Sequence, residues 1–438
     1  MKFSRTLTKF CLAASVAYAG AAMAATQEDV DRTFFPYKTE KPNVSVPAVG
    51  TVINASNLDS VGKDVLDEGM YRMVKDGWVE LTVGDLTPIA LHPNYVKATR
   101  DNLNTAKLGK ETGELTGYVA GRPFPEEPDI NDPRAGEKLA WNNRFSLHFG
   151  DSGRIGPFYW KYRDMNSGKV EKTLKLEFNA YNWKHRTINA PLPEVEQNPG
   201  DLFRTIYIRV DEPFDVKNTQ LLIHRYSDDL KRDNAWLYLG FQRRVRRLAS
   251  GQVTDAFLGS DLMIEDFEGY NGRISDQKWT YKGVRWMLVP VYNHNEMELG
   301  EEFKMDDFQY TTFGGKGGCF PNITWQVRKN YLLEAVPTDP NHPVGHRDMF
   351  VDAQTFAFTR INIYDRADKL WKMWFIGQGD YNSHLPEHKG IGVPVYDGFG
   401  MMDVQAMHCT TGHFRTTIHP EDVNTKMFTP QYLRATGR

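Results

Sequence analysis

Four arginines lie within five residues of one predicted strand: Arg243, Arg244, Arg246 and Arg247. Because side chains alternate along a strand, Arg244 and Arg246 share one face, and the other two share the opposite face. Guanidinium groups match the oxygens of carboxylates and phosphates, so one face could bind an anionic head group. The alternative is ion pairing with three acids further along the chain, which are Asp261, Glu265 and Asp266. The sequence favours this ion pairing over a ligand site.

A large set of aromatic residues accompanies the arginines, mostly in strand-like runs. An apolar ligand cavity needs such side chains on the concave face of a curved sheet. The same side chains could instead fill the core between sheet and helices, and the sequence does not separate the two roles. The candidate ligand-binding residues are Trp160, Trp183, Phe241, Arg244, Arg246 and Trp286.

Motifs for catalysis or cofactor binding are not recognisable. The glycine-rich stretch 314–319 lacks the Gly-Lys-Ser/Thr ending of a phosphate loop, and no Gly-x-Ser-x-Gly elbow marks a serine nucleophile. His384 and His388 have helical spacing, but Pro386 between them disfavours a helix. We therefore expect no catalytic residue, no metal site and no cofactor, and a protein that is not an enzyme.

The N-terminus is typical of a cleaved secretory signal over residues 1–24. Three basic residues precede a short apolar run, and Ala22-Met23-Ala24 fits a small-x-small cleavage pattern. Removing this segment leaves 50 basic and 56 acidic residues, a charge of −6, which argues against a nucleic-acid partner. The expected location is the periplasm of a Gram-negative bacterium. There, Cys319 and Cys409 either form a disulfide or stay separate buried thiols, and both alternatives stay open.

Along the chain, the sequence predicts helices in the first part and strands in the second. Residues 25–57 are predicted to be an extended arm, because they are polar and contain three prolines. Residues 58–150 are a helical segment with helices predicted at 59–78, 93–108 and 132–148. Consecutive hairpins over 151–380 predict a mainly β, α+β fold: a large curved antiparallel sheet forming an incomplete barrel. The N-terminal helices would pack on or plug this sheet, and 381–438 would be a wrapping C-terminal tail.

Several motifs together resemble a known periplasmic family. They are Tyr118–Pro125 (YVAGRPFP), Asp132–Asn142 (DPRAGEKLAWN), Arg243–Arg247 (RRVRR) with Gly259–Leu262 (GSDL), Phe350–Ala353 (FVDA), Ile363–Asp365 (IYD) and Leu370–Lys372 (LWK). This pattern is similar to the family of domain of unknown function thirteen twenty-nine. The second half is also similar to the lipoprotein-localisation (Lol) carrier fold, in which a curved antiparallel sheet forms an incomplete, apolar-lined barrel.

The resemblance implies a periplasmic protein that binds or transfers lipids or other hydrophobic molecules. It also implies two partners, an outer-membrane barrel protein and an inner-membrane exporter of the resistance-nodulation-division type. The alternative function is a ligand-free periplasmic adaptor that docks onto a membrane transport complex. An enzyme acting on a lipid or sterol-like substrate is a third class, for which the sequence offers no motif.

Overall fold

The structure is a computed structural model that describes residues 24–198, 200–249, 253–305, 308–419 and 423–437. The predicted signal peptide therefore lies outside the described residues except for Ala24. The α-helices are α1 (Gln27–Phe34), α2 (Pro36–Thr39), α3 (Glu68–Lys75), α4 (Pro93–Asp101), α5 (Ala135–Arg144), α6 (Tyr381–His384) and α7 (Pro430–Thr436). No helix in the described ranges is long and apolar enough to span a bilayer.

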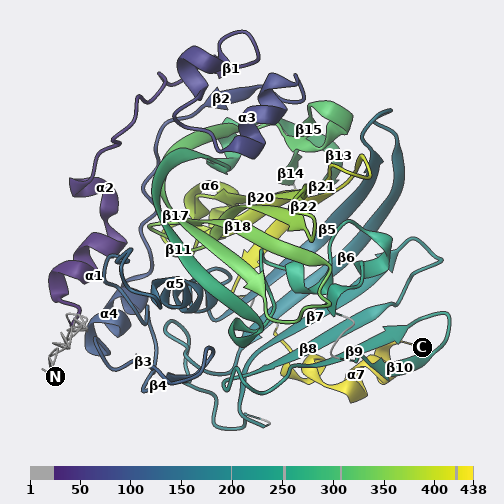
Figure 1. Cartoon of the computed structure of the whole chain (residues 1–438). Helices are drawn as coiled ribbons and strands as arrows, with labels where there is room; N and C mark the ends of the chain where they lie inside the picture. The colour runs from purple at the N-terminus through teal and green to yellow at the C-terminus, as the bar shows by residue number, and fades with distance from the viewer. Residues whose placement is uncertain (1–23, 199, 250–252, 306–307, 420–422, 438) are drawn as a thin grey trace, which may run out of the picture.

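One large sheet dominates the protein, and most of its neighbouring strands are antiparallel. Its first group of long strands is β5 (Ser152–Asp164), β6 (Val170–Asn182), β7 (Leu202–Glu212), β8 (Gln220–Tyr226), β9 (Asn234–Leu239) and β10 (Arg244–Arg247). Its second group is β11 (Gln277–Val289), β17 (Thr324–Pro337), β18 (Val344–Asp352), β19 (Phe358–Asp365), β20 (Leu370–Gly379), β21 (Val395–Asp403) and β22 (His408–Ile418). The strands curve around a central space without closing into a barrel (Figure 1), which confirms the predicted fold class.

The remaining strands are short, and some of them join the large sheet while others form separate ribbons. Those joined to the large sheet are β1 (Val52–Ile53), β2 (Leu81–Val83) and β12 (Val291–Tyr292). Those in separate two-stranded ribbons are β3 (Lys107–Leu108) with β4 (Leu115–Thr116), β13 (Leu299–Met305) with β14 (Phe308–Thr311), and β15 (Phe313–Gly314) with β16 (Phe320–Pro321). The pairs β2–β17 and β12–β20 are parallel, so the large sheet is mixed at these points.

The predicted C-terminal tail is wrong for its first half, because β21 and β22 lie in the middle of the sheet. β21 pairs with β20, and β22 pairs with β5 from His408 opposite Asp164 to Ile418 opposite Gly153. Nearly every residue of β21 is buried, so the strand lacks the alternation of polar and apolar residues that identifies a half-exposed strand. The sheet therefore extends past residue 380 and joins its two strand groups through β22 and β5.

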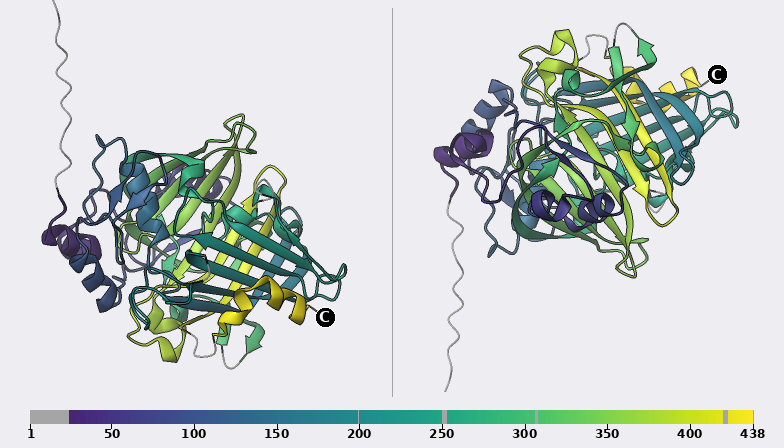
Figure 2. Two further views of the ribbon diagram at one scale, coloured as in Figure 1. Left: turned by 90° about the horizontal axis from the view of Figure 1, so that it is seen from below. Right: turned by 90° about the horizontal axis from the view of Figure 1, so that it is seen from above.

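The second half of the predicted tail does cover the sheet. Residues 425–436 form a 3-10 turn and α7, which pack on the outer face of β7 to β9. Phe428 and Leu433 contact a cluster that includes Tyr207, Leu222 and Tyr238. Figure 2 shows α7 against these strands, at the end of the sheet remote from α1 and α4.

The predicted extended arm is also wrong at its start, where α1 and α2 form. Thr26 and Asp29 make a capping box: the Asp29 amide donates to Thr26 Oγ1 at 3.2 Å, and the Thr26 amide donates to Asp29 Oδ2 at 2.7 Å. Val30 and Phe34 are then buried, and the Phe34 ring meets Tyr95 of α4 edge to face. This helix is short and polar, and it depends on tertiary burial that local periodicity does not reveal.

The three longer predicted helices are all shorter in the structure. The first becomes a π-helical turn at Leu58–Gly62 followed by α3, because Asp67 accepts a hydrogen bond from the Gly69 amide and starts a new helix. The second ends at Asp101 and the third spans only Ala135–Arg144. Helix α5 packs on β11 and β17, whereas α3 packs on the opposite face of the sheet.

Alternation along β20 separates the two faces of the sheet. Trp374 and Ile376 point to the concave side, where α1, α4 and α5 contribute to the largest apolar cluster. Met373 and Phe375 point to the outer side, into the cluster that α3 covers. Because both faces are covered by other elements, the sheet contributes to separate cores on its two sides.

Candidate functional site

A segment of residues 257–276 runs across the concave face of the sheet, and we call it the crossing segment. It contains 3-10 turns at Phe257–Gly259, Ile264–Asp266 and Ile274–Asp276 but no longer helix. Phe257 and Phe267 both meet the Trp160 ring of β5 edge to face, with centroids 5.9 and 6.2 Å away. The crossing segment therefore covers the concave face near β5. The N-terminal helices pack on other parts of the sheet.

An apolar chamber lies between the crossing segment and the sheet. Its volume is about 50 Å³. The sheet residues that line it are Ile155, Phe158, Trp160, Phe178, Ile208, Trp374, Ile376, Tyr396, Phe399 and Phe414. The covering residues are Phe149, Leu262, Phe267 and Glu268. The chamber forms only because β21 and β22 lie beside β5, which brings aromatic rings from residues 158 to 414 into one place.

Three polar groups of the chamber-lining residues are buried without a hydrogen-bond partner in the described structure. They are Trp160 Nε1, Trp374 Nε1 and Tyr396 Oη. Burial, with Glu268 nearby, raises the pKa of Tyr396, so its hydroxyl stays neutral and can donate. An unpaired buried donor is destabilising unless a ligand or water satisfies it. Almost all of the surface that faces the chamber is nevertheless apolar, so the chamber suits an apolar molecule.

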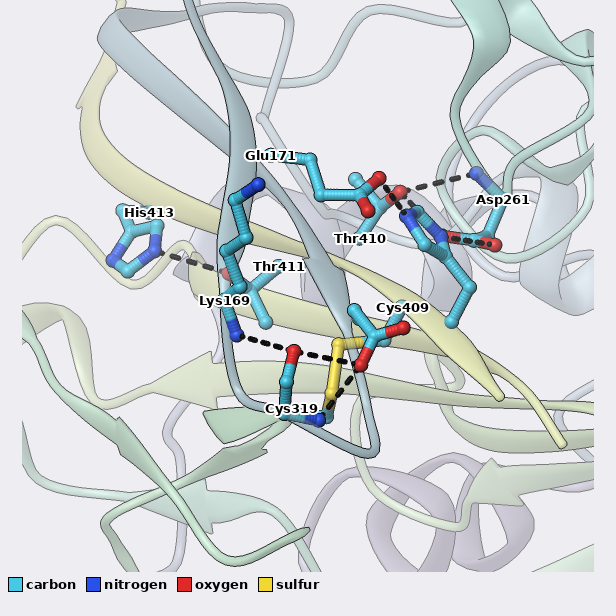
Figure 3. Close-up of a disulfide and its surroundings, with 11 residues drawn as sticks. Lys169, Glu171, Asp261, Cys319, Cys409, Thr410, Thr411 and His413 are labelled. Atoms are coloured by element: carbon cyan, nitrogen blue, oxygen red, sulfur yellow. Dashed lines mark hydrogen bonds and ion pairs between the residues drawn. A yellow bond between two sulfur atoms is a disulfide. The ribbon is translucent and has the colours of Figure 1, made fainter. Parts of the chain in front are cut away.

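Buried ion pairs fasten the crossing segment to the sheet at three points. At the first, Asp261 accepts hydrogen bonds from Thr410 Oγ1 at 2.7 Å and pairs with His408 Nδ1 at 2.9 Å. The hydrogen bond and charge of Asp261 raise the pKa of His408 despite its partial burial. Figure 3 shows Asp261 beside Thr410, close to the disulfide between Cys319 and Cys409. Of the two alternatives for the cysteines, the structure contains the disulfide.

The second attachment joins Arg347 of β18 to two consecutive acids. Arg347 pairs with Glu265 and, at 3.3 Å, with Asp266, and all three side chains are buried. Burial alone would raise the pKa of Glu265, but Arg347 and His342 lower it to about 2. Burial raises the pKa of Asp266, and Arg347 offsets only part of this effect. Glu265 therefore carries the negative charge that Arg347 balances.

The third attachment lies where the apolar chamber meets a polar pocket. Glu268 lines both cavities and accepts a hydrogen bond from Arg204 of β7 at 2.6 Å. Burial would raise the pKa of Glu268, but Arg204 and His148 lower it, so this carboxylate is charged. The polar pocket, about 20 Å³, is also lined by Arg144 and Arg225. At Glu268 the apolar chamber therefore adjoins a pocket that is lined by charged side chains.

The structure brings only one of the six candidate ligand residues to the chamber, namely Trp160. Trp183 is buried on the outer face in the cluster under α7, where its Nε1 donates to Thr205 Oγ1 at 3.1 Å. Trp286 is buried in the outer cluster under α3. Phe241, Arg244 and Arg246 lie exposed at the edge strand β10 and the turn before it. The sequence pattern did not show which aromatic side chains lie on the concave face and which lie on the outer face.

The predicted pairing of the arginine cluster with downstream acids is wrong. Asp261 pairs with His408, and both Glu265 and Asp266 pair with Arg347. The acids belong to the crossing segment on the concave side, whereas β10 is the last strand at one end of the sheet. The arginines and the acids are close in sequence, which suggested that they pair. They are separated in the structure because the chain leaves the edge strand β10 and crosses the concave face before it reaches the acids.

Sequence reasoning missed five aromatic residues of the chamber: Phe149, Phe267, Tyr396, Phe399 and Phe414. Three of them lie in the stretch predicted to be a tail. A signal was available in Gly412, which is opposite Phe399 in the sheet. A Cβ built at Gly412 would lie 2.1 Å from the Phe399 ring, so glycine leaves room for that ring.

A second buried cluster contains His294, His384 and Asp397, and its ligand types fit a metal ion. His294 Nδ1 lies 2.7 Å from Asp397, whose charge raises the pKa of His294 even though burial opposes this. His384 Nε2 accepts a hydrogen bond from the Thr416 amide at 2.9 Å, so neutral His384 keeps its proton on Nδ1. Nδ1 faces Asp397 Oδ1 at 3.5 Å, but neither of these two atoms has a hydrogen-bond partner in the described structure. The hydrogen bonds of His294 to Asp397 and of the Thr416 amide to His384 link the cluster to β21 and β22.

Comparison with known proteins places the chain among uncharacterised relatives. Over 353 residues it is 24% identical to the uncharacterized protein PA3922 of Pseudomonas aeruginosa, covering 77% of this chain and 70% of that one. A crystal structure of a DUF1329 family protein from Desulfovibrio piger aligns with a TM-score of 0.47 and 17% identity, covering 69% of this chain and all of that one. The LolA superfamily protein NE2245 from Nitrosomonas europaea aligns with a TM-score of 0.37 and 12% identity, covering 64% and 91%.

The family model described as protein of unknown function (DUF1329) matches residues 52–434. That range includes the sheet, the crossing segment and most of the helices that cover them. Because the match spans most of the sequence, this chain belongs to the DUF1329 family of proteins of unknown function.

Proposed function

We propose that this protein binds a lipid or another hydrophobic molecule in the periplasm, on the concave face of its sheet. The observation that carries the proposal is the almost entirely apolar chamber under the crossing segment. Affinity would come from removing apolar ligand surface from water, at about 25 cal/mol per Å². The disulfide between Cys319 and Cys409 supports an oxidising compartment such as the periplasm.

The size of the chamber defines how a ligand would enter. A volume of about 50 Å³ is well below that of the engineered protein cavities, of roughly 150 Å³, that hold benzene. A lipid would therefore have to displace Leu262 and Phe267, the apolar side chains that the crossing segment places over the chamber. The ion pairs of Asp261, Glu265 and Glu268 hold this segment at both sides of those residues. We infer that ligand binding and opening of the crossing segment are one coupled step.

We propose a binding role rather than catalysis because the charged groups of the site already have partners. Glu268 is paired with Arg204, and Asp261 with His408. The remaining polar groups of the lining residues are two indole N–H groups and the Tyr396 hydroxyl, which are neutral and lie in walls that are almost entirely apolar. The ligand-free adaptor is the competing interpretation, and the same experiment separates the two.

The direct test is lipid extraction and mass spectrometry of the protein purified from its native periplasm. We expect a co-purifying hydrophobic molecule, and we expect the delipidated protein to bind both this molecule and a hydrophobic fluorescent dye. An empty protein that also fails to rebind would contradict the proposal. A stable membrane-protein partner recovered without any ligand would favour the adaptor.

A matched pair of substitutions locates the site. Ile208 and Val210 point to the same side of β7, but only Ile208 lines the chamber. We expect Ile208→Phe to fill the chamber and lower dye affinity about tenfold, a change of roughly 1.4 kcal/mol. Val210→Phe carries an overpacking cost of about 1–3 kcal/mol and should leave dye affinity near the wild-type value. Fluorescence titration of the two variants checks this, and equal losses in both would place the ligand elsewhere.

A further inference from the structure

Two loop tips at one end of the sheet lie side by side. The first is the turn at 213–219 between β7 and β8, and the second is the turn at 240–243 between β9 and β10. Gln220 and Tyr238 are register partners in the neighbouring strands β8 and β9. The tips touch: a Cβ built at Gly240 would lie 2.3 Å from the carbonyl oxygen of Lys217. In Figure 1 these strands end on the side of the molecule away from α1 and α4.

Each tip exposes a phenylalanine. The side chains of Phe214 and Phe241 are 93% and 73% exposed, more than any other large apolar side chain in the described residues. The next two are Val49 at 63% and Ile130 at 60%, and they lie in the N-terminal third of the chain, far along it from these tips. Single exposed apolar residues are common on protein surfaces. Two phenylalanines on adjoining tips form a local apolar feature that the fold leaves uncovered.

The surroundings of the two phenylalanines are strongly basic. Five exposed cations belong to the tips and to β10: Lys217, Arg243, Arg244, Arg246 and Arg247. None of the five has an ion-pair partner within the described ranges, while the three acids at the end of β7 and in its turn do. Those acids are Asp211 with Arg209, Glu212 with Lys175, and Asp215 with Lys172. The tips therefore carry an excess of positive charge on a protein whose net charge is −3.

We propose that these two tips dock the protein onto the surface of an anionic lipid bilayer. Phe214 and Phe241 would enter the interface between head groups and acyl chains, where aromatic rings are favoured. The arginines and Lys217 would meet the lipid phosphates, since a polybasic surface is attracted to anionic lipids over about one Debye length. This surface is independent of the chamber and does not rest on the ligand proposed above.

A bilayer fits the geometry better than a protein partner does. A stable protein interface buries about 800 Å² on each side and needs a broad complementary surface. Here the apolar part consists of two protruding side chains on narrow turns, flanked by charge rather than surrounded by further apolar residues. Insertion into a bilayer needs only a few apolar side chains combined with charge attraction.

The test is co-sedimentation of the full chain with lipid vesicles. We expect binding to vesicles of phosphatidylethanolamine and phosphatidylglycerol, much weaker binding to phosphatidylcholine alone, and loss of binding in high salt. Phe214→Ala with Phe241→Ala should weaken the binding at least about tenfold. Replacing the four arginines by glutamine should remove the preference for anionic vesicles. As a matched control, Val49→Ala with Ile130→Ala should bind like the wild type.

A second measurement reports insertion directly. In Phe241→Trp the new indole lies in water, so its emission should shift to the blue when phosphatidylglycerol vesicles are added. Because all substituted residues are exposed, the variants should fold, and dye binding in the chamber should be unchanged. Equal binding to both kinds of vesicle, or unaltered binding by the phenylalanine double variant, would overturn the proposal. If the tip variants still bound vesicles but no longer bound the dye, the dye site would lie at the tips, and this would contradict the proposed role of the chamber.

Discussion

Replacing Arg347 by methionine is expected to lower the free energy of unfolding by about 3–5 kcal/mol, because it leaves buried charge without its partner. Arg347 is fully buried and holds both Glu265 and Asp266 of the crossing segment. Without the guanidinium, the pKa of Glu265 would rise from its low value as burial becomes dominant. Urea unfolding of the variant at neutral pH measures the effect.

Two further variants test the cause of this loss. Lys97→Met breaks a surface pair with Asp101, in which both side chains are more than half exposed, and should change stability by less than about 1 kcal/mol. Adding Glu265→Gln and Asp266→Asn to Arg347→Met should recover part of the stability, since no unpaired charge then stays buried. A loss below about 1 kcal/mol in Arg347→Met alone would show that the pair does not anchor the segment.

The second large effect is a loss of stability in mild acid. His413 belongs to β22 and His388 is buried against that strand. Burial together with nearby cationic or histidine side chains lowers the pKa of each to about 3. Unfolded histidine titrates near pH 6.5, so between pH 6.5 and about 3 the unfolded chain binds protons that the folded chain does not. Their stabilising contribution is therefore complete above about pH 6.5 and decreases as the pH falls.

The expected size follows from proton linkage. Each histidine changes the free energy of unfolding by about 1.4 kcal/mol per pH unit in this range, so the pair should remove about 4 kcal/mol between roughly pH 7.5 and 5. His294 and His408 have raised pKa values and act in the opposite direction, so the contribution is isolated by comparison with a variant.

The appropriate variant is His388→Gln. His388 Nε2 accepts a hydrogen bond from the Ile418 amide at 3.1 Å, which a glutamine carbonyl oxygen can replace. The slope of unfolding free energy against pH should become smaller by about 1.4 kcal/mol per pH unit at pH 4–6. Urea unfolding at several pH values checks this, and an unchanged slope would mean that His388 is protonated in the folded protein.

Local strand signals were sufficient for much of the sheet. The residues Asn166-Ser-Gly168 are typical of a hairpin turn, and they join the paired antiparallel strands β5 and β6. The consecutive hairpins predicted over 151–380 include β7 with β8 and the antiparallel run of β18, β19 and β20. These features depend on residues that are neighbours in sequence, through turn preference and side-chain alternation.

The candidate site could not be predicted in the same way. Trp160 was identified with Trp183 and Trp286, but those two lie on the outer face, because alternation does not say which face of a strand is concave. The arginine cluster looked like a partner for the acids of the crossing segment, whereas it lies at the edge of the sheet. One of its four arginines, Arg243, lies in the second tip and the other three lie in the adjoining β10, on the basic surface that we propose for bilayer docking.

The sequence by itself determined that this chain is rich in antiparallel strands and that its sheet is rich in aromatic residues. Its motifs also indicated the resemblance to one protein family. Only the tertiary structure decided that β22 pairs with β5, that residues 257–276 cross the concave face, and that Phe399 and Phe414 join Trp160 in one chamber. The physical reason is distance along the chain. Pairing between strands about 250 residues apart is selected by the burial of complete surfaces, and it leaves no periodic trace in either strand.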